Sequence, residues 1–407
     1  MSSAADQFKW AARVLLLIAG TGIGLGIGEV GFRVLGDGLS GSPGRQPEVL
    51  VHRASDNPKL VYQPAPNAEN DYLGMIHRIN RAGFRDREFS AEKTAGVTRI
   101  LFLGDSVVYG WGLEADETIP KQIERAIRRE GQSGEVLNFG VSGYEAEQAV
   151  EFFKELGRGF DPDVVLLGYT LNDSGTGSFE LRRFFEMTPL TIKVPRPDRR
   201  LLDWLYRHSA MMATLDRRLR LQERFPRLRS YDAQSPYEFT MRRERALADP
   251  PGSVYRGLRD RVIAEARRRG TPAEALEAHL EFTGLWSTFR ASHTAHWNLS
   301  KRAFLELKDL SQRHGFDVIA VIFPHMLEMD RYPLGPVHAF LAREFRELGF
   351  GVVDLLDWAA GQDPSIALEP IHFSPRGASL VGEYLYRRVF STPDGLRPIE
   401  PNPESPR

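Results

Sequence analysis

The sequence predicts an α/β fold in which a parallel sheet of five strands is doubly wound, with the strands in flavodoxin-like order. Five short apolar runs recur along the chain, and segments with helical periodicity separate them. This alternation is typical of parallel sheets covered by helices on both faces, and ligands of such sheets bind at the carboxyl ends of the strands. The predicted strands are 100–103, 136–141, 163–168, 318–323 and 352–355.

The composition limits the classes of function. Lys and Arg number 53 against 54 Asp and Glu, so the net charge of −1 provides no global field for nucleic acid, and no nucleic-acid partner is expected. An apolar content of 42% is enough for a sizeable core, and 407 residues predict one main domain with additions. The absence of cysteine excludes disulfides, thiolate metal sites and a cysteine nucleophile.

No cofactor and no metal are expected. Gly26, Gly28 and Gly31 satisfy the spacing of a dinucleotide-binding motif, but no predicted strand precedes them and no βαβ unit contains them. His293 and His296 lie three residues apart without a third ligand at metalloprotease spacing, which disfavours a zinc site.

The N-terminal segment 1–35 is predicted to be a transmembrane signal anchor. Residues 14–28 are uncharged and apolar or glycine-rich, and with the apolar residues after Glu29 they reach the lower limit of about 17 residues for a spanning helix. Lys9 and Arg13 precede the run, so the positive-inside rule leaves the short tail in the cytoplasm and the remaining chain outside. A cleaved signal peptide is the alternative, and the lack of an A-x-A-like site counts against it.

Three glycines, Gly20, Gly24 and Gly28, recur at four-residue spacing inside this run. Such spacing lets two membrane helices approach closely, so a homodimer through the anchor is one interpretation. Glycines that line a single helix without a partner are the other interpretation.

Three segments depart from the alternation of strands and helices. Residues 36–75 are rich in Gly, Pro, Ser and polar residues and are predicted to be a tether. Approximately residues 176–303 are rich in arginine with interspersed aromatics, which predicts a helical cap inserted after the third strand. Its arginines are interpreted as a solvated, ion-paired face, with contact to anionic lipid headgroups or an acidic glycan as the alternative. Residues 391–407 are predicted to be a disordered tail.

A Gly-Asp-Ser turn follows the first predicted strand. Gly104 lets the chain turn sharply, Asp105 and Ser106 lie on the turn, and an amphipathic helix follows. A serine between a strand and a helix is exposed at the carboxyl edge of a sheet, as a nucleophile must be. Because Val108 stands two residues after the serine, the turn is not a G-x-S-x-G elbow. Taken alone, it indicates no more than a helix cap.

Candidate site residues also follow later strands. Gly143 comes after the second strand, and a residue without Cβ lets its N–H approach a ligand closely. Asn172 comes after the third strand, beside Asp173, which is interpreted as structural. Glu369 and His372 lie on the loop before a helix that begins with a Ser-Pro pair.

Taken in order, these four stretches resemble the four blocks of the SGNH (GDSL-type) hydrolase superfamily, and the chain is similar to its membrane-anchored bacterial members. The resemblance covers roughly residues 98–390, apart from the insertion, and implies the SGNH hydrolase fold for a catalytic domain of residues 76–390. It implies that Ser106 is the nucleophile and that His372 is the general base and then the general acid. The backbone N–H groups of Ser106 and Gly143 and the side-chain amide of Asn172 would form the oxyanion hole.

Glu369 departs from the superfamily pattern, which has an aspartate three residues before the histidine. A glutamate can still accept a hydrogen bond from the imidazole, so Glu369 is predicted to be the third catalytic residue. Asp354 and Asp357, at the end of the last strand, are the alternatives. His325 follows another strand and is either a pocket residue or a packed loop residue.

The segment before the first strand also resembles that of membrane-anchored members, with Asn80, Gly83 and Arg85 in an Asn, Gly and Arg-acid pattern. An ordinary packed segment is the favoured interpretation of these residues.

The resemblance implies a membrane-anchored serine esterase that hydrolyses an ester of a lipid, a glycan or a small acyl compound through an acyl-Ser106 intermediate. It places the chain in the bacterial inner membrane with the catalytic domain on the periplasmic or extracytoplasmic side. An O-acyltransferase or deacetylase acting on a cell-envelope glycan is the nearest alternative, because the cap and water exclusion choose the acceptor. A non-catalytic binding or assembly protein that keeps the fold is the alternative from another class, and Glu369 motivates it.

Overall fold

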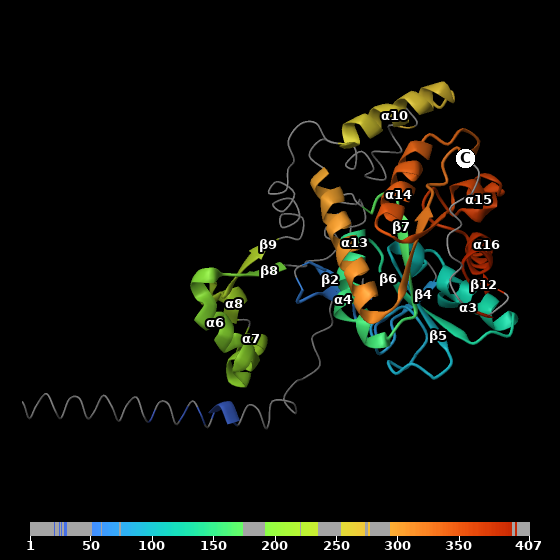
Figure 1. Ribbon diagram of the computed structural model, residues 1–407. Coiled ribbons are helices and arrows are strands. Elements are labelled where there is room, and N and C mark those ends of the chain that lie inside the picture. Colours follow the sequence, from blue (N-terminus) through green and yellow to red (C-terminus); the bar gives the residue numbers. More distant parts are fainter. Residues whose placement is uncertain are drawn as a thin grey trace, which may run out of the picture. The chain divides into compact units, whose positions relative to one another are not determined.

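The computed structural model describes residues 51–57, 59–72, 75–173, 192–219, 221–234, 254–272 and 294–392, together with residues 20, 24, 26, 28–30, 276 and 395–396 (Figure 1). The chain divides into two compact units. One comprises residues 1–48 and 191–234, and the other comprises residues 49–190 and 235–407.

A five-stranded parallel sheet forms the centre of the larger unit (Figure 1). Its strands are β5 (Thr98–Gly104), β6 (Gly134–Gly140), β7 (Val164–Thr170), β10 (Asp317–Phe323) and β11 (Gly351–Asp354). They lie in the order β11-β10-β7-β5-β6, and every neighbouring pair is parallel. Counted along the chain this is the order 2-1-3-4-5, so the predicted flavodoxin-like sheet is confirmed, and each predicted apolar run is one of its strands.

Helices bury both faces of this sheet. α3 (Ile119–Arg129) and α16 (Pro375–Leu385) pack against each other, as do α4 (Ala146–Glu155) and α13 (Thr294–His314), while α14 (Gly335–Glu347) packs on β10 and β11. On β5, Ile100 and Phe102 belong to the core that includes α3 and α16. Leu101 and Leu103 alternate with them and are equally buried. Burial on both faces explains why the strands read as continuous apolar runs.

The chain before β5 is folded, which corrects the predicted tether for residues 51 to 75. β1 (His52–Ala54) pairs with β2 (Tyr62–Pro64), and β3 (Glu69–Tyr72) pairs with β4 (Met75–Arg78). Tyr62 is buried, and its hydroxyl donates a hydrogen bond of 2.6 Å to the carbonyl of Ser142. The tether prediction was wrong here because these short hairpins gain their burial from the domain and not from one another.

The described part of the predicted cap is mainly helical. In the smaller unit, α6 (Arg200–His208), α7 (Ala210–Leu219) and α8 (Leu221–Arg224) lie between two paired strands, β8 (Ile192–Pro195) and β9 (Tyr231–Gln234). In the larger unit, α10 (Val254–Arg268) packs on α14. α13 begins at Thr294, inside the range expected for the insertion, and leads back into the sheet at β10.

The predicted anchor, residues 1–35, lies mostly outside the described residues. In the part of the chain that the structure describes, no helix is both long and apolar enough to cross a membrane. Glu29, one of the described positions, accepts hydrogen bonds from the Ser209 hydroxyl and the Ala210 amide at the start of α7. Of the predicted tail 391–407, β12 (Ser391–Thr392) pairs with β13 (Gly395–Leu396), and the other residues lie outside the described set.

Candidate active site

The serine turn connects β5 to α2 (Ser106–Tyr109) at the carboxyl edge of the sheet. Asp105 is the N-cap of α2, and its carboxylate accepts a hydrogen bond of 2.9 Å from the amide of Val107. The cap predicted for this turn is therefore present. It leaves Ser106 as the first residue of the helix, where its backbone N–H has no partner within the helix and can serve a ligand.

His372 and Glu369 come from the loop that precedes α16. The amide of Leu368 donates to the carbonyl of His372 at 2.9 Å, which closes a tight turn around these two residues. Nε2 of His372 lies 2.8 Å from Oγ of Ser106, and Nδ1 hydrogen-bonds the carboxylate of Glu369. The structure thus joins Ser106, His372 and Glu369 in one hydrogen-bonded chain across 266 residues of sequence.

Glu369 is the carboxylate that faces the imidazole. Its second oxygen accepts a hydrogen bond of 3.2 Å from the amide of Ile371. Partial burial by itself would raise the pKa of Glu369, but the hydrogen bond and the charge of His372 outweigh it and hold the pKa below its ordinary value. The carboxylate is therefore ionised at neutral pH, and the extra methylene of glutamate does not prevent contact with the ring.

The alternative carboxylates do not contact His372. Asp354 accepts from Nδ1 of His338 at 2.7 Å, and the other nitrogen of that ring lies 3.1 Å from the Tyr332 hydroxyl. Asp357 is exposed on the short helix α15 (Leu356–Ala360). His325 is completely buried just after β10.

The predicted oxyanion residues follow the two strands that flank β5. Gly143 follows β6 and has φ +76°, a conformation that residues with a Cβ rarely adopt. Asn172 follows β7, and its amide oxygen is buried with no hydrogen-bond partner among the described residues. Because β6 and β7 both pair with β5 in parallel, these residues leave the sheet at the same edge as Ser106.

A second buried carboxylate lies behind this edge. Asp173 is 2% exposed, and it accepts a hydrogen bond of 2.8 Å from the amide of Thr170. Burial, reinforced by the nearby charge of Asp105, raises the pKa of Asp173 well above its ordinary value. The structural role expected for Asp173 is consistent with these contacts, since it ties the end of β7 to the residue after Asn172.

Replacement of Asp173 by asparagine is expected to stabilise the protein in a pH-dependent way. An acid whose pKa is raised by folding contributes full stability below its unfolded pKa and loses it as the pH rises toward the folded pKa. Asparagine keeps the acceptor for Thr170 and has no proton to lose, so Asp173→Asn should gain about 1–2 kcal/mol at pH 8 and little at pH 4.

Urea unfolding of both proteins at the two pH values checks this expectation, with Asp330→Asn, an exposed carboxylate, as the matched control. An equal loss of stability at both pH values would contradict it.

Trp111 is a site residue that none of the sequence motifs contains. Its ring packs against the imidazole of His372, with 4.6 Å between ring centroids and 33° between the planes. The only signal in the sequence is its position between two turn glycines, Gly110 and Gly112, directly after α2.

The fold and this site define an enzyme of the SGNH hydrolase class, which acts on ester bonds. Residues 102–300 match the family described as GDSL-like Lipase/Acylhydrolase. The chain carries a domain of this family, in agreement with the resemblance that the sequence motifs indicate.

Solved structures of low sequence identity are similar to this chain. The lipase/acylhydrolase from Enterococcus faecalis is 13% identical, with 71% of this chain and 94% of that chain covered and a TM-score of 0.34. The esterase EstA from Pseudoalteromonas sp. is 12% identical, with coverages of 71% and 94% and a TM-score of 0.33. The acetyl xylan esterase AlAXEase is 10% identical, with coverages of 72% and 100% and a TM-score of 0.36. No curated protein matches the sequence.

Proposed function

We propose that the protein is a membrane-anchored serine esterase that hydrolyses a carboxylic ester through an acyl-Ser106 intermediate. The hydrogen-bonded chain of Ser106, His372 and Glu369 is the observation that carries the proposal. His372 takes the proton of Ser106 as the oxygen attacks the ester carbonyl, and Glu369 stabilises the imidazolium that forms. His372 then gives the proton to the departing alcohol. In the second half of the reaction His372 takes a proton from water, the water oxygen attacks the acyl-enzyme, and the proton returns to Ser106 as the acid leaves.

Three donors would stabilise the oxyanion of each tetrahedral intermediate. They are the backbone N–H groups of Ser106 and Gly143 and the side-chain amide of Asn172. The positive φ of Gly143 and the buried amide oxygen of Asn172 support this assignment. An amide whose oxygen is turned inward leaves its NH₂ end as the part that can meet a ligand.

Removal of the Asn172 amide should therefore lower kcat more than it lowers affinity for the ester. Asn172→Ala deletes one donor that acts chiefly on the developing charge, so we expect kcat to fall on the order of 10²–10³-fold with a small change in KM. Steady-state hydrolysis of p-nitrophenyl acetate measures both constants. A rise in KM at unchanged kcat would argue against an oxyanion role.

Labelling with a serine-directed fluorophosphonate tests the nucleophile directly. The purified full chain in detergent should be labelled, and Ser106→Ala and His372→Ala should both lose the label, because the reagent requires an activated serine. Absence of labelling in the wild type would favour the non-catalytic alternative. A sugar alcohol that diverts acyl product from the free acid would identify acyl transfer to a glycan in place of hydrolysis.

We also propose that residues 1–35 anchor the chain in the bacterial inner membrane with the catalytic domain outside the cytoplasm. The apolar run and the cations before it support this topology. Because the chain has no cysteine, single substitutions report on it cleanly. A membrane-impermeant maleimide should label Leu305→Cys, an exposed position on α13, in intact spheroplasts, and Ser2→Cys only after lysis. The reverse pattern would overturn the orientation.

A further inference from the structure

A buried arginine, Arg85, supports the turn that follows the serine helix. Its side chain is 1% exposed, and Nη1 donates hydrogen bonds to the carbonyls of Tyr109 at 3.0 Å and Gly110 at 2.8 Å. Nη2 donates to the carbonyl of Leu113, and the guanidinium lies 4.9 Å from the centroid of the Tyr109 ring. Every one of these acceptors lies within seven residues of Ser106.

Arg85 is held in this position without an ion pair among the described residues, and its Nε is buried without a hydrogen-bond partner there. Burial lowers its pKa despite the charges of Glu114 and Glu117 farther along the chain. A buried cation that is satisfied by backbone carbonyls is costly compared with an apolar side chain. The burial of Arg85 therefore indicates a role other than packing.

The turn that Arg85 holds carries Trp111. Gly110 ends α2 with φ +82°, and the amides of Gly110 and Trp111 both donate to the carbonyl of Ser106, at 3.0 and 2.9 Å. A Cβ at Gly112 would lie 2.5 Å from the side chain of Leu368, so the turn abuts the loop that carries Glu369 and His372. The indole of Trp111 is thus fixed to Ser106 by its backbone and to His372 by its ring.

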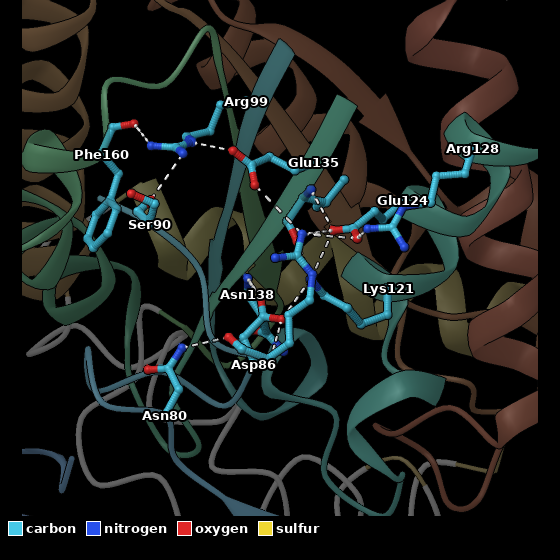
Figure 2. Close-up of polar contacts among 12 residues, drawn as sticks. Asn80, Asp86, Ser90, Arg99, Lys121, Glu124, Arg128, Glu135, Asn138 and Phe160 are labelled. Atoms are coloured by element: carbon cyan, nitrogen blue, oxygen red, sulfur yellow. Dashed lines mark hydrogen bonds and ion pairs between the residues drawn. The ribbon is translucent and has the colours of Figure 1, made fainter. Parts of the chain in front are cut away.

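The residue after Arg85 ties the same segment to the neighbouring strand (Figure 2). Asp86 accepts a hydrogen bond of 2.8 Å from the amide of Asn138 on β6 and pairs with Lys121 at 2.7 Å. Asn80 stabilises the turn before them, accepting from the amide of Phe84 and donating to the carbonyl of Arg87, both at 2.9 Å. The segment 80–86 is therefore anchored to the strand that leads to Gly143 as well as to the turn after α2.

We propose that Arg85 is a positioning residue that holds Trp111 against the imidazole of His372, and that the indole face stabilises the imidazolium formed during each proton transfer. An aromatic face attracts a cation electrostatically, and more strongly when the pair is desolvated, as His372 is at 3% exposure. The contact also restrains the ring in the orientation that reaches Ser106. This proposal rests on the proposed function, because it assigns a role to the imidazolium.

Arg99 provides a matched control within the same chain. It is also 1% exposed, and it donates to backbone carbonyls, including that of Phe160 at 2.7 Å, and to Glu135 at 2.7 Å (Figure 2). It lies near the start of β5, at the opposite end of the strand from Ser106. Arg99→Met therefore measures what the loss of a buried, carbonyl-bound arginine costs in stability, without touching the turn after α2.

The experiment measures kcat, KM and the urea unfolding midpoint of the full chain with p-nitrophenyl acetate as the ester. Arg85→Met and Trp111→Ala should each lower kcat roughly 10–100-fold with KM within about twofold. The double variant should fall no further than the more severe single variant, because both changes break one chain of contacts. Arg99→Met should lower the midpoint while kcat per folded molecule stays within about twofold of the wild type.

Arg85→Lys gives a second test if Arg85→Met does not fold. A single ammonium cannot span carbonyls at both ends of the turn, so this variant should keep the fold and recover only part of kcat. Full kcat in Arg85→Lys, or additive losses in its combination with Trp111→Ala, would overturn the proposal while the wild type remains an active, fluorophosphonate-labelled esterase. A wild type with neither activity nor label would instead overturn the proposed function on which this inference depends.

Discussion

Replacement of Ser106 by alanine is expected to lower kcat for p-nitrophenyl acetate by about 10⁵–10⁶-fold. The Oγ of Ser106 lies 2.8 Å from Nε2 of His372 and is the atom that forms the acyl-enzyme, so its removal leaves no nucleophile in acyl transfer. The fold should survive, because the Oγ of Ser106 contributes a single strong hydrogen bond and Asp105 continues to cap α2. The oxyanion donors leave a residual acceleration over water.

The measurement requires a control for contaminating esterase. Ser311→Ala removes a serine hydroxyl on α13 that donates to the carbonyl of Lys308 in the same helix, and it should retain full activity after the same purification. Activity of Ser106→Ala above about one per cent of the wild type, with no fluorophosphonate label, would remove the acyl-serine mechanism.

Replacement of Glu369 by glutamine is the second large expected effect, a loss in kcat of about 10³–10⁴-fold. The amide keeps the size of the carboxylate but removes the negative charge that faces the imidazolium, and its NH₂ end favours the wrong tautomer of His372. Glu369→Asp should recover part of the activity, since it restores the charge on a side chain shorter by one methylene.

Asp354→Asn is the matched control for this comparison. Asp354 pairs with His338, not with His372, so its kcat should stay within a few-fold of the wild type. Equal losses from Glu369→Gln and Asp354→Asn would remove Glu369 from the role of third catalytic residue.

The sheet could be predicted from the sequence because its strands are buried on both faces. Leu101 and Phe102 point to opposite sides of β5, and both are completely buried. The start of α16 could also be predicted from the sequence, since Ser374 caps the helix and Pro375 occupies its first turn. The residues that lie near Ser106 were predicted from the order of the four motifs, because no single motif indicates them by its own residues.

Other features could not be predicted from the sequence. The hairpins before β5 are short and polar, with Glu, Asn and Asp in β3, and they fold through contacts such as that of Tyr62 with Ser142. The partners of Arg85 are backbone carbonyls, which any residue type would supply. Trp111 contacts His372 from a position that no spacing rule links to it.

The folding of residues 51 onward into the catalytic domain sets a working radius for the enzyme if residues 1–35 anchor it. The hydroxyl of Tyr62 donates a hydrogen bond to the carbonyl of Ser142, and the hydroxyl of Tyr144 donates one to the carbonyl of Tyr62. This part of the chain is therefore held to the domain and adds no length to the link. Residues 36–50 can span at most about 50 Å, the fully extended length of that number of residues. A link of this length would confine the anchored enzyme to esters near the bilayer surface.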